Sequence, residues 1–438
     1  MGARGAPRPH AEAGAPLLKR PERPGRNPAG GRGAEGSRWH RAYGLTEVPG
    51  KSGRRGIAAA LVVLSLLLAG SAAQAQDLPA GQVLHAVQGL NDPTISYSLY
   101  LPKAYTPDRD WPVLLGFHFE ARGGLIVEKY REAAERYGYI VAGSNVSRNG
   151  DWNRSVRAAE AMVNEIGRRF AVDPARVYAT GLSGGSRLAM ALAISTNKFA
   201  GVIASSAGLP DGETRRTLKF PVYMTAGYYD FNYLEMRNLD RTLKSPHRLA
   251  LFAGGHVLPT DEVAMRAIEW MELHAMAAGL RPTDPEFVAY LWTRREEAVA
   301  AAGETPEGVR QLRAAADDFR RIGDVKAIES RANALARRAD VKAAIERERR
   351  NDLAEAELVE SIVRYEVELS VRSKRNDGLA ALRQIVSDLR RKASQPASPE
   401  RERALRVLEI ITYEPGRRVW DAEYLKVLLD AAPSLKSD

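Results

Sequence analysis

The sequence contains no cysteine, so the fold receives no stabilisation from disulfides and must be held together by its core alone. Hydrophobic residues make up 45% of the 438 positions, which is ample for such a core. The sequence also lacks a phosphate-binding loop and a helical pair of histidines with the spacing of zinc ligands. We therefore predict neither a nucleotide cofactor nor a metal ion.

A basic surface for nucleic acid is also lacking, although the net charge is +10. Residues 1–56 carry twelve Lys and Arg against four Asp and Glu, so most of this charge lies in the first segment of the chain. The remainder is close to neutral and shows no basic stripe with interleaved aromatic residues. The composition therefore argues against a nucleic-acid partner.

The first 75 residues resemble a leader and an export signal. Residues 1–50 are rich in Gly, Pro, Arg and Ala and have no apolar periodicity, which predicts a disordered or mis-annotated leader. Residues 51–75 contain basic residues, an apolar run and a small-residue cleavage site, which predicts a signal peptide cleaved before Gln76. A membrane-spanning helix is the alternative, but the strongly apolar run is short of the roughly 20 residues it needs. We therefore expect export to the periplasm or the extracellular space, with no stable membrane span after cleavage.

From Gln76 to about Leu280 the sequence alternates between short β-rich runs and amphipathic helices. This alternation is typical of an α/β domain with a mostly parallel sheet. The inner runs lack charge, as strands buried on both faces should. The predicted strands span 95–102, 112–118, 138–144, 175–181, 201–207, 221–227 and 247–254.

One glycine-flanked serine follows the strand predicted over 175–181. Residues 181–185, Gly-Leu-Ser-Gly-Gly, fit the G-x-S-x-G pattern, with a strand before it and a helix after it. Such a turn strains the backbone and exposes Ser183 at the carboxyl edge of the sheet, while Gly184 can offer its N–H to an oxyanion. A glycine-rich structural turn is the alternative reading. The pattern favours Ser183 as a nucleophile if a base and an acid follow it.

Three histidines follow Ser183 along the chain. His274 lies within a helical pattern and His247 precedes a strand, so both read as structural. His256 lies in the segment FAGGHVLPT, in a loop directly after the last predicted strand. We therefore predict that His256 is the general base.

Two aspartates compete for the role of the acid. Asp230 lies in TAGYYDFNY, at the carboxyl end of the strand predicted over 221–227, whereas Asp211 follows an earlier strand. A turn or helix-cap role is the alternative for Asp230. Order along the chain and position at the sheet edge favour Asp230.

The segments SLYLPKAY, DPARVYATGLSGGSRLA and GGHVLP together resemble the polyhydroxybutyrate depolymerase and feruloyl esterase-like branch of the α/β-hydrolases. The resemblance covers residues 80–280 approximately and implies an α/β-hydrolase fold, a triad of Ser183, Asp230 and His256, and hydrolysis of carboxylic esters. It departs at two places. Phe119 stands where the family has glycine in the oxyanion hole, although its N–H can still donate together with that of Gly184. Gly184-Gly185-Ser186 also replaces the usual Asn-Gly-Gly after the nucleophile.

Aromatic residues near these motifs are candidates for substrate binding. Tyr228 and Tyr229 precede Asp230, in a cluster that also holds Phe231 and Tyr233, and Trp152 follows another strand end. They can line an apolar pocket, or they can simply pack beneath the loops. The spacing leaves both interpretations open.

After residue 280 the composition changes, and residues 284–438 are predicted to form a separate all-helical domain. The stretch from 324 to 377 contains neither Gly nor Pro, and apolar residues recur at helical spacing. Breaks at GETPEG, NDG, SQPASPE and YEPG predict five to seven helices, whose charged faces we interpret as solvated surface. Docking to a protein or polymer is a hypothesis for this domain.

Three functions follow from these patterns. The first is an exported serine hydrolase that cleaves small-molecule or polymeric esters through an acyl-enzyme. The second is a hydrolase-fold binding or scaffold protein with weak or no catalysis. The third is a serine peptidase, which is chemically close to the first.

Overall fold

The computed structural model describes residues 78–90, 92–413 and 421–431. The predicted leader and signal peptide lie outside the described residues. Among the residues that are described, no helix combines the length and the apolar character needed to cross a bilayer.

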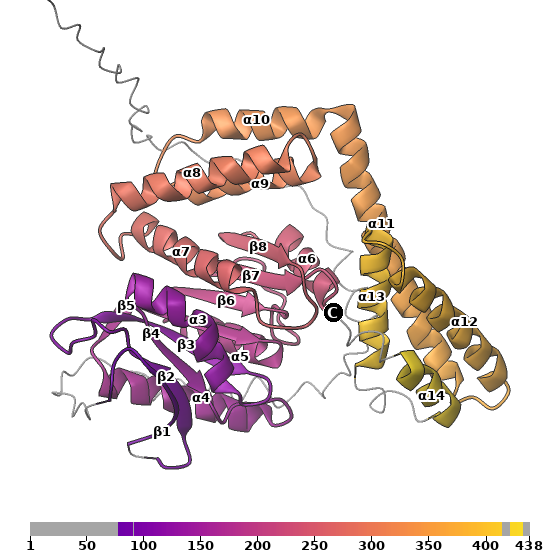
Figure 1. Cartoon of the computed structure of the whole chain (residues 1–438), viewed down its shortest axis with the longest axis horizontal. Helices are drawn as coiled ribbons and strands as arrows, with labels where there is room; N and C mark the ends of the chain where they lie inside the picture. Colours follow the sequence, from indigo (N-terminus) through magenta and orange to yellow (C-terminus); the bar gives the residue numbers. More distant parts are fainter. Residues whose placement is uncertain (1–77, 91, 414–420, 432–438) are drawn as a thin grey trace, which may run out of the picture. The chain divides into compact units, whose positions relative to one another are not determined.

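The chain first builds a sheet of eight strands, which confirms the predicted α/β architecture (Figure 1). The strand order is β1-β2-β4-β3-β5-β6-β7-β8. β2 runs antiparallel to both of its neighbours, and the pairs from β4 to β8 are parallel. The strands are β1 (Val83–Gln88), β2 (Ser96–Tyr100), β3 (Trp111–His118), β4 (Ile140–Ser144), β5 (Val172–Leu182), β6 (Gly201–Ser205), β7 (Val222–Gly227) and β8 (His247–Phe252).

All seven strands predicted from the sequence are present, and β1 is the one that was missed. β1 is an edge strand that pairs only with β2 in the described sheet, and an irregularity between Leu84 and Val87 interrupts its register. Its side chains are mostly half-buried or exposed. It therefore lacks the continuous apolar run that identifies an inner strand.

Helices cover both faces of the sheet and create two cores (Figure 1). One core packs α4, α5 and α6 against the sheet, and the other packs α3 and α7 against the opposite face. Strands β3, β4, β6 and β7 are buried along their whole length, and their apolar side chains contribute to both cores. The helices are α3 (Gly123–Tyr137), α4 (Trp152–Arg169), α5 (Gly184–Thr196), α6 (Tyr233–Thr242) and α7 (Asp261–Ala277).

The remaining described chain is helical, as predicted. Its seven helices fall within the predicted number of five to seven, but the break expected at Asn376-Asp377-Gly378 lies earlier, because these residues form the first turn of α12. The helices are α8 (Pro285–Ala302), α9 (Pro306–Phe319), α10 (Lys326–Arg337), α11 (Ala339–Glu368), α12 (Arg375–Ala393), α13 (Pro399–Thr412) and α14 (Ala422–Ala431).

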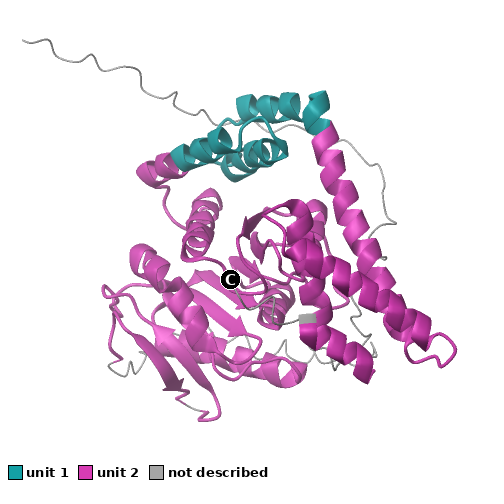
Figure 2. Ribbon diagram, turned by 45° about the vertical axis from the view of Figure 1, so that its right-hand side comes forward, with its two compact units in different colours: residues 1–30, 292–342 teal, residues 31–291, 343–438 magenta. Residues whose placement is uncertain are grey.

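The described chain divides into two compact units (Figure 2). The smaller unit contains residues 292–342, in which Trp292 packs edge-on against Phe319 and Arg295 pairs with Asp318 at 2.7 Å. The larger unit groups the sheet and its helices with residues from 343 onward. In that unit α11 to α14 share an apolar core of their own.

The charged faces of the C-terminal helices are not only solvated surface, which corrects the sequence interpretation. Asp352, Glu355, Glu366 and Arg406 are all buried. Arg406 forms a two-point ion pair with Glu355, at 2.9 and 2.6 Å. These residues therefore belong to the interior of the larger unit. Burying a charge is costly, and ion pairs such as that of Arg406 with Glu355 offset this cost.

Candidate active site

Ser183 lies at the sharp turn between β5 and α5. Its φ of +57° and ψ of −122° are strained values for a residue with a side chain. The turn is tight because a Cβ on Gly181 would meet the backbone of Gly185 at 2.4 Å. A Cβ on Gly185 would meet the carbonyl oxygen of Phe117 at 2.2 Å. Only glycine fits at these two positions, as expected for a nucleophile elbow.

The hydroxyl of Ser183 is not used by the helix that follows it. It makes no capping hydrogen bond to α5, although serine at a helix start usually makes one. The next residue, Gly184, begins α5, and N–H groups in the first turn have no partner within the helix. The positive end of the helix dipole therefore lies beside the hydroxyl.

Asp230 and His256 meet although 26 residues separate them. The Nδ1 of His256 lies 2.8 Å from the Oδ1 of Asp230. Because a carboxylate can only accept, Nδ1 carries the proton and Nε2 is left as an acceptor. The side chain of Asp230 is fully buried and that of His256 is 6% exposed. This pair has the geometry of an acid that fixes the tautomer of a general base.

The Nε2 of His256 is buried and makes no hydrogen bond within the described chain. A hydrogen bond from the Ser183 hydroxyl to this nitrogen is therefore not formed here. Catalytic hydrogen bonds are often long or absent until substrate binds. The pair of Asp230 and His256 is formed, whereas the link to the nucleophile stays a prediction.

The competing residues have other surroundings. Asp211 is exposed in a turn. Both ring nitrogens of His247 bond to backbone carbonyl groups, at Ser245 and Asp240, so this ring has a structural role. His274 packs against Trp270 within α7.

His118 is the last residue of β3, and Phe119 follows it in a turn beside the histidine loop. The Phe119 ring stacks on His118, and its centroid lies 6.3 Å from that of His256. Burial lowers the pKa of His118 to about 4, and its Nδ1 accepts the N–H of Glu120 at 3.1 Å. His118 is therefore a neutral residue that shapes the turn in which Phe119 lies.

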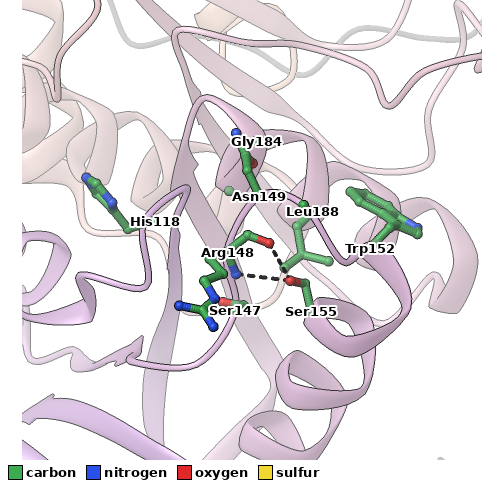
Figure 3. Close-up of a pocket in the computed structure, with 10 residues that line it drawn as sticks. His118, Ser147, Arg148, Asn149, Trp152, Ser155, Gly184 and Leu188 are labelled. Atoms are coloured by element: carbon green, nitrogen blue, oxygen red, sulfur yellow. Dashed lines mark hydrogen bonds between the residues drawn. The ribbon is translucent and has the colours of Figure 1, made fainter. Parts of the chain in front are cut away.

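A pocket of about 100 Å³ opens next to the elbow (Figure 3). Trp152 from the start of α4 lines it, together with His118, Asn149, Gly184 and others. Ser155 bonds to the backbone of Arg148 in the loop before α4, which fixes that wall (Figure 3). Tyr228 and Tyr229, which were also predicted to bind substrate, do not line this pocket.

Two aromatic residues beside Asp230 pack against other groups. Phe231 stacks on the imidazole of His256, with centroids 3.9 Å apart. Tyr233 lies under the guanidinium of Arg406, 4.2 Å from the ring centroid. For these two residues the packing interpretation holds.

Sequence reasoning missed Glu409 on α13 and Tyr413, the residue directly after that helix. Glu409 accepts the N–H of His256, and Tyr413 packs on Phe231. They lie more than 150 positions after the histidine motif, and nothing in their local sequence differs from an ordinary amphipathic helix. The only sequence signal for these residues is their helical spacing. That spacing predicts that they share one side of a helix, but it does not identify what this side contacts.

Among the described residues, no group of three His, Cys, Asp or Glu side chains could hold a metal ion. The candidate site comprises a strained serine, a paired histidine and aspartate, and the backbone N–H groups beside them.

No protein-family model and no curated protein matches the chain. Solved structures of esterases are similar to it over about half its length. One is the esterase Est2 from Thermogutta terrifontis with butyrate bound, at 14% identity, covering 48% of this chain and 98% of that one, with a TM-score of 0.36. Another is the S-formylglutathione hydrolase of Staphylococcus aureus, at 17% identity, covering 44% and 98%, with a TM-score of 0.34.

A third similar structure is the carboxylesterase EstE1, cloned from a metagenomic library, at 16% identity, covering 48% of this chain and 92% of that one, with a TM-score of 0.36. The fold itself follows from the strand order, the antiparallel β2 and the elbow between β5 and α5. The sheet and its flanking helices have the α/β-hydrolase fold.

Proposed function

We propose that the protein is a serine hydrolase that cleaves carboxylic esters. The observation that carries the proposal is the 2.8 Å contact between Asp230 and His256, on loops after β7 and β8 of the sheet whose strand β5 leads into the strained, uncapped Ser183. Order along the chain also supports it, because serine, acid and histidine occur in the sequence typical of this fold.

In the proposed reaction the Oγ of Ser183 attacks the ester carbonyl carbon while Nε2 of His256 takes its proton. The N–H groups of Gly184 and Phe119 stabilise the oxyanion. The C–O bond to the alcohol then breaks, and His256 gives the proton to the leaving alkoxide. Water, activated by His256, hydrolyses the acyl-enzyme and restores Ser183.

The size of the pocket supports a short acyl group. The pocket, of about 100 Å³, is lined by Trp152 and by Gly184, the residue after Ser183, so a short acyl group on Ser183 is the part of a substrate that it would receive. A polyester or feruloyl substrate, as the family resemblance implies, requires its larger part to lie outside this pocket. We therefore propose that short acyl esters are cleaved faster than feruloyl esters.

A fluorophosphonate probe tests the reaction class, because it forms a covalent bond only with an activated serine. We expect labelling of the wild-type protein and of Ser195→Ala, a matched serine at the far end of α5. Ser183→Ala should not be labelled. The p-nitrophenyl esters of acetate and butyrate, compared with feruloyl and hydroxyalkanoate esters, then define the acyl group.

A non-catalytic scaffold is the second candidate, because Nε2 of His256 makes no hydrogen bond among the described residues. Folded wild-type protein that is not labelled, and that hydrolyses none of these esters, would favour the scaffold. A serine peptidase would be labelled but would cleave peptides in preference to esters.

We further propose that the protein acts in the periplasm or outside the cell, as the leader indicates. Fractionation of cells, with an antibody to the sheet domain, tests this location. Protein retained in the cytosol at its full length would contradict it. Docking of the C-terminal helices to a partner stays a prediction.

A further inference from the structure

One face of α13 lies against the two loops that carry Asp230 and His256. Arg406 and Glu409 of α13 and Tyr413, its C-cap residue, follow each other at spacings of three and four, which places them on the same side of the helix. All three contact the loop after β7 or the loop after β8. This face is therefore in direct contact with the surroundings of the histidine.

Glu409 joins the two loops through one carboxyl group. It accepts the N–H of His256 at 3.3 Å, and the N–H of Phe231 also bonds to it. A Cβ on Gly255 would lie 3.2 Å from Oε1 of Glu409, so the carboxyl group packs directly on the loop backbone. The residue after Asp230 and the backbone of His256 are thus held by the same side chain.

Tyr413 continues this support through a stack of aromatic rings. Its ring centroid lies 4.5 Å from that of Phe231, which in turn stacks on His256 at 3.9 Å with an interplanar angle of 20°. The face of the imidazole is therefore fixed by Phe231, and its edge by the bond to Asp230. Together these contacts leave the ring little freedom to rotate.

Arg406 anchors α13 to the same region. It donates to the carbonyl oxygen of Tyr228 at 2.6 Å and pairs with Glu355 of α11. Its guanidinium also lies over Tyr233. Because Tyr228 and Tyr233 flank Asp230 in sequence, the acid loop is held at both ends.

We propose that Glu409 and Tyr413 are positioning residues for His256, so that the C-terminal helical region completes the histidine part of the active site. The inference rests on the proposed serine-hydrolase function and deepens it. A hydrolase with this arrangement needs α13 for the orientation of its base, and not only for stability.

The charge state of Glu409 agrees with this role. Burial, together with the negative charge of Asp230, raises the pKa of Glu409 to about 8. Asp230 and His256 are the titratable groups that face it from the sheet domain, and Arg406 on its own helix is occupied by Glu355. At neutral pH the carboxyl group is therefore protonated, and it adds no second negative charge beside the imidazole.

The test compares Glu409→Ala and Glu409→Gln with Glu400→Ala, an exposed glutamate on the same helix. The first measurement is the NMR signal of the His256 Nδ1 proton in protein labelled with ¹⁵N-histidine, assigned by its loss in His256→Gln. This signal reports the bond to Asp230 whether or not the protein is catalytic. We expect it to be retained in Glu400→Ala and Glu409→Gln, and lost or strongly broadened in Glu409→Ala.

The second measurement is the kcat and KM for p-nitrophenyl acetate as a function of pH. Glu409→Ala should lower kcat by about 10- to 100-fold with little change in KM, because the base is misplaced while the acyl pocket is intact. Glu409→Gln should keep most of kcat at neutral pH and lose any inflection near pH 8 that the wild type shows. If Glu409→Ala does not fold, Tyr413→Leu replaces it with the same expected result.

Wild-type values of both the Nδ1 signal and kcat in Glu409→Ala would overturn the proposal. A wild type that cleaves no ester, combined with loss of the signal in Glu409→Ala, would overturn the serine-hydrolase function but support the positioning role. The two proposals therefore fail by different results.

Discussion

The proposed nucleophile and the pair of Asp230 and His256 are held in place by different kinds of structure. Ser183 is fixed by its own neighbours, since β5, α5 and two glycines force the turn within five residues. Asp230 and His256 lie on loops that receive contacts from α13, far along the chain. Local geometry therefore presents Ser183, the proposed nucleophile, whereas long-range packing orients His256, the proposed base. We therefore expect mutations near Ser183 and mutations near Asp230 and His256 to have different effects.

The largest effect is expected at the acid. Asp230→Asn replaces an acceptor by a side chain that can donate to Nδ1 of His256, which favours the wrong tautomer and should lower kcat about 10⁴-fold. Asp211→Asn is the matched control, because Asp211 is exposed and should leave kcat within about twofold. Ester hydrolysis by the two purified variants measures the effect. A larger loss of kcat in Asp211→Asn than in Asp230→Asn would mean that Asp211, and not Asp230, is the acid.

The next effect tests the long-range support. Arg406→Met leaves the buried Glu355 without its partner, so the free energy of unfolding should fall by about 4 kcal/mol. Arg383→Met breaks an exposed pair with Glu423 and should cost at most about 1 kcal/mol. Urea denaturation of both variants gives the two values. Equal costs would mean that Arg406 does not anchor α13.

The third effect tests the local support. Gly185→Ala places a Cβ against the carbonyl oxygen of Phe117, and the resulting shift of α5 should destabilise the fold by about 3 kcal/mol. Gly279→Ala has a positive φ of 71° but open space around it, so strain alone should cost about 1 kcal/mol. Thermal denaturation compares them. A cost for Gly185→Ala no greater than that for Gly279→Ala would show that the elbow tolerates a side chain.

The same comparison explains what the sequence could predict. Seven of the eight strands and the elbow were identified because buried strands lack charge and because G-x-S-x-G between a strand and a helix constrains its own backbone. Asp230 and His256 were chosen because both follow strands that end at one edge of the sheet. Each of these signals is contained in a short stretch of chain.

The contributions of α13 could not be predicted in this way. Glu409 and Arg406 occur in a helix with many charged residues, and a charged residue on a helix is usually solvated. Their burial depends on the loops that pack against them, which are separated from them by more than 150 residues. The role of Phe231 could not be predicted either. Its position in the sequence is compatible with lining a pocket and with the stacking on His256 that it forms.

The smallest effect is a pH dependence of stability that arises from Glu409. Because its pKa is raised to about 8 from an ordinary value of 4.5, the folded state binds more protons than the unfolded state between these values. The free energy of unfolding should therefore fall as the pH rises from about 5 to 8, by on the order of 1 kcal/mol for this partly buried group. Glu409→Gln should remove that part of the slope.

Urea denaturation of the wild type and of Glu409→Gln across this range isolates the contribution of Glu409. His118 acts with the opposite sign, since burial lowers its pKa to about 4 and stability is lost as the pH falls from about 6.5 toward that value. Its effect is present in both proteins and cancels in the difference. Parallel slopes would mean that Glu409 is ionised in the folded protein. In that case the loops around Asp230 and His256 would accept a second negative charge, which the N–H of His256 would help to stabilise.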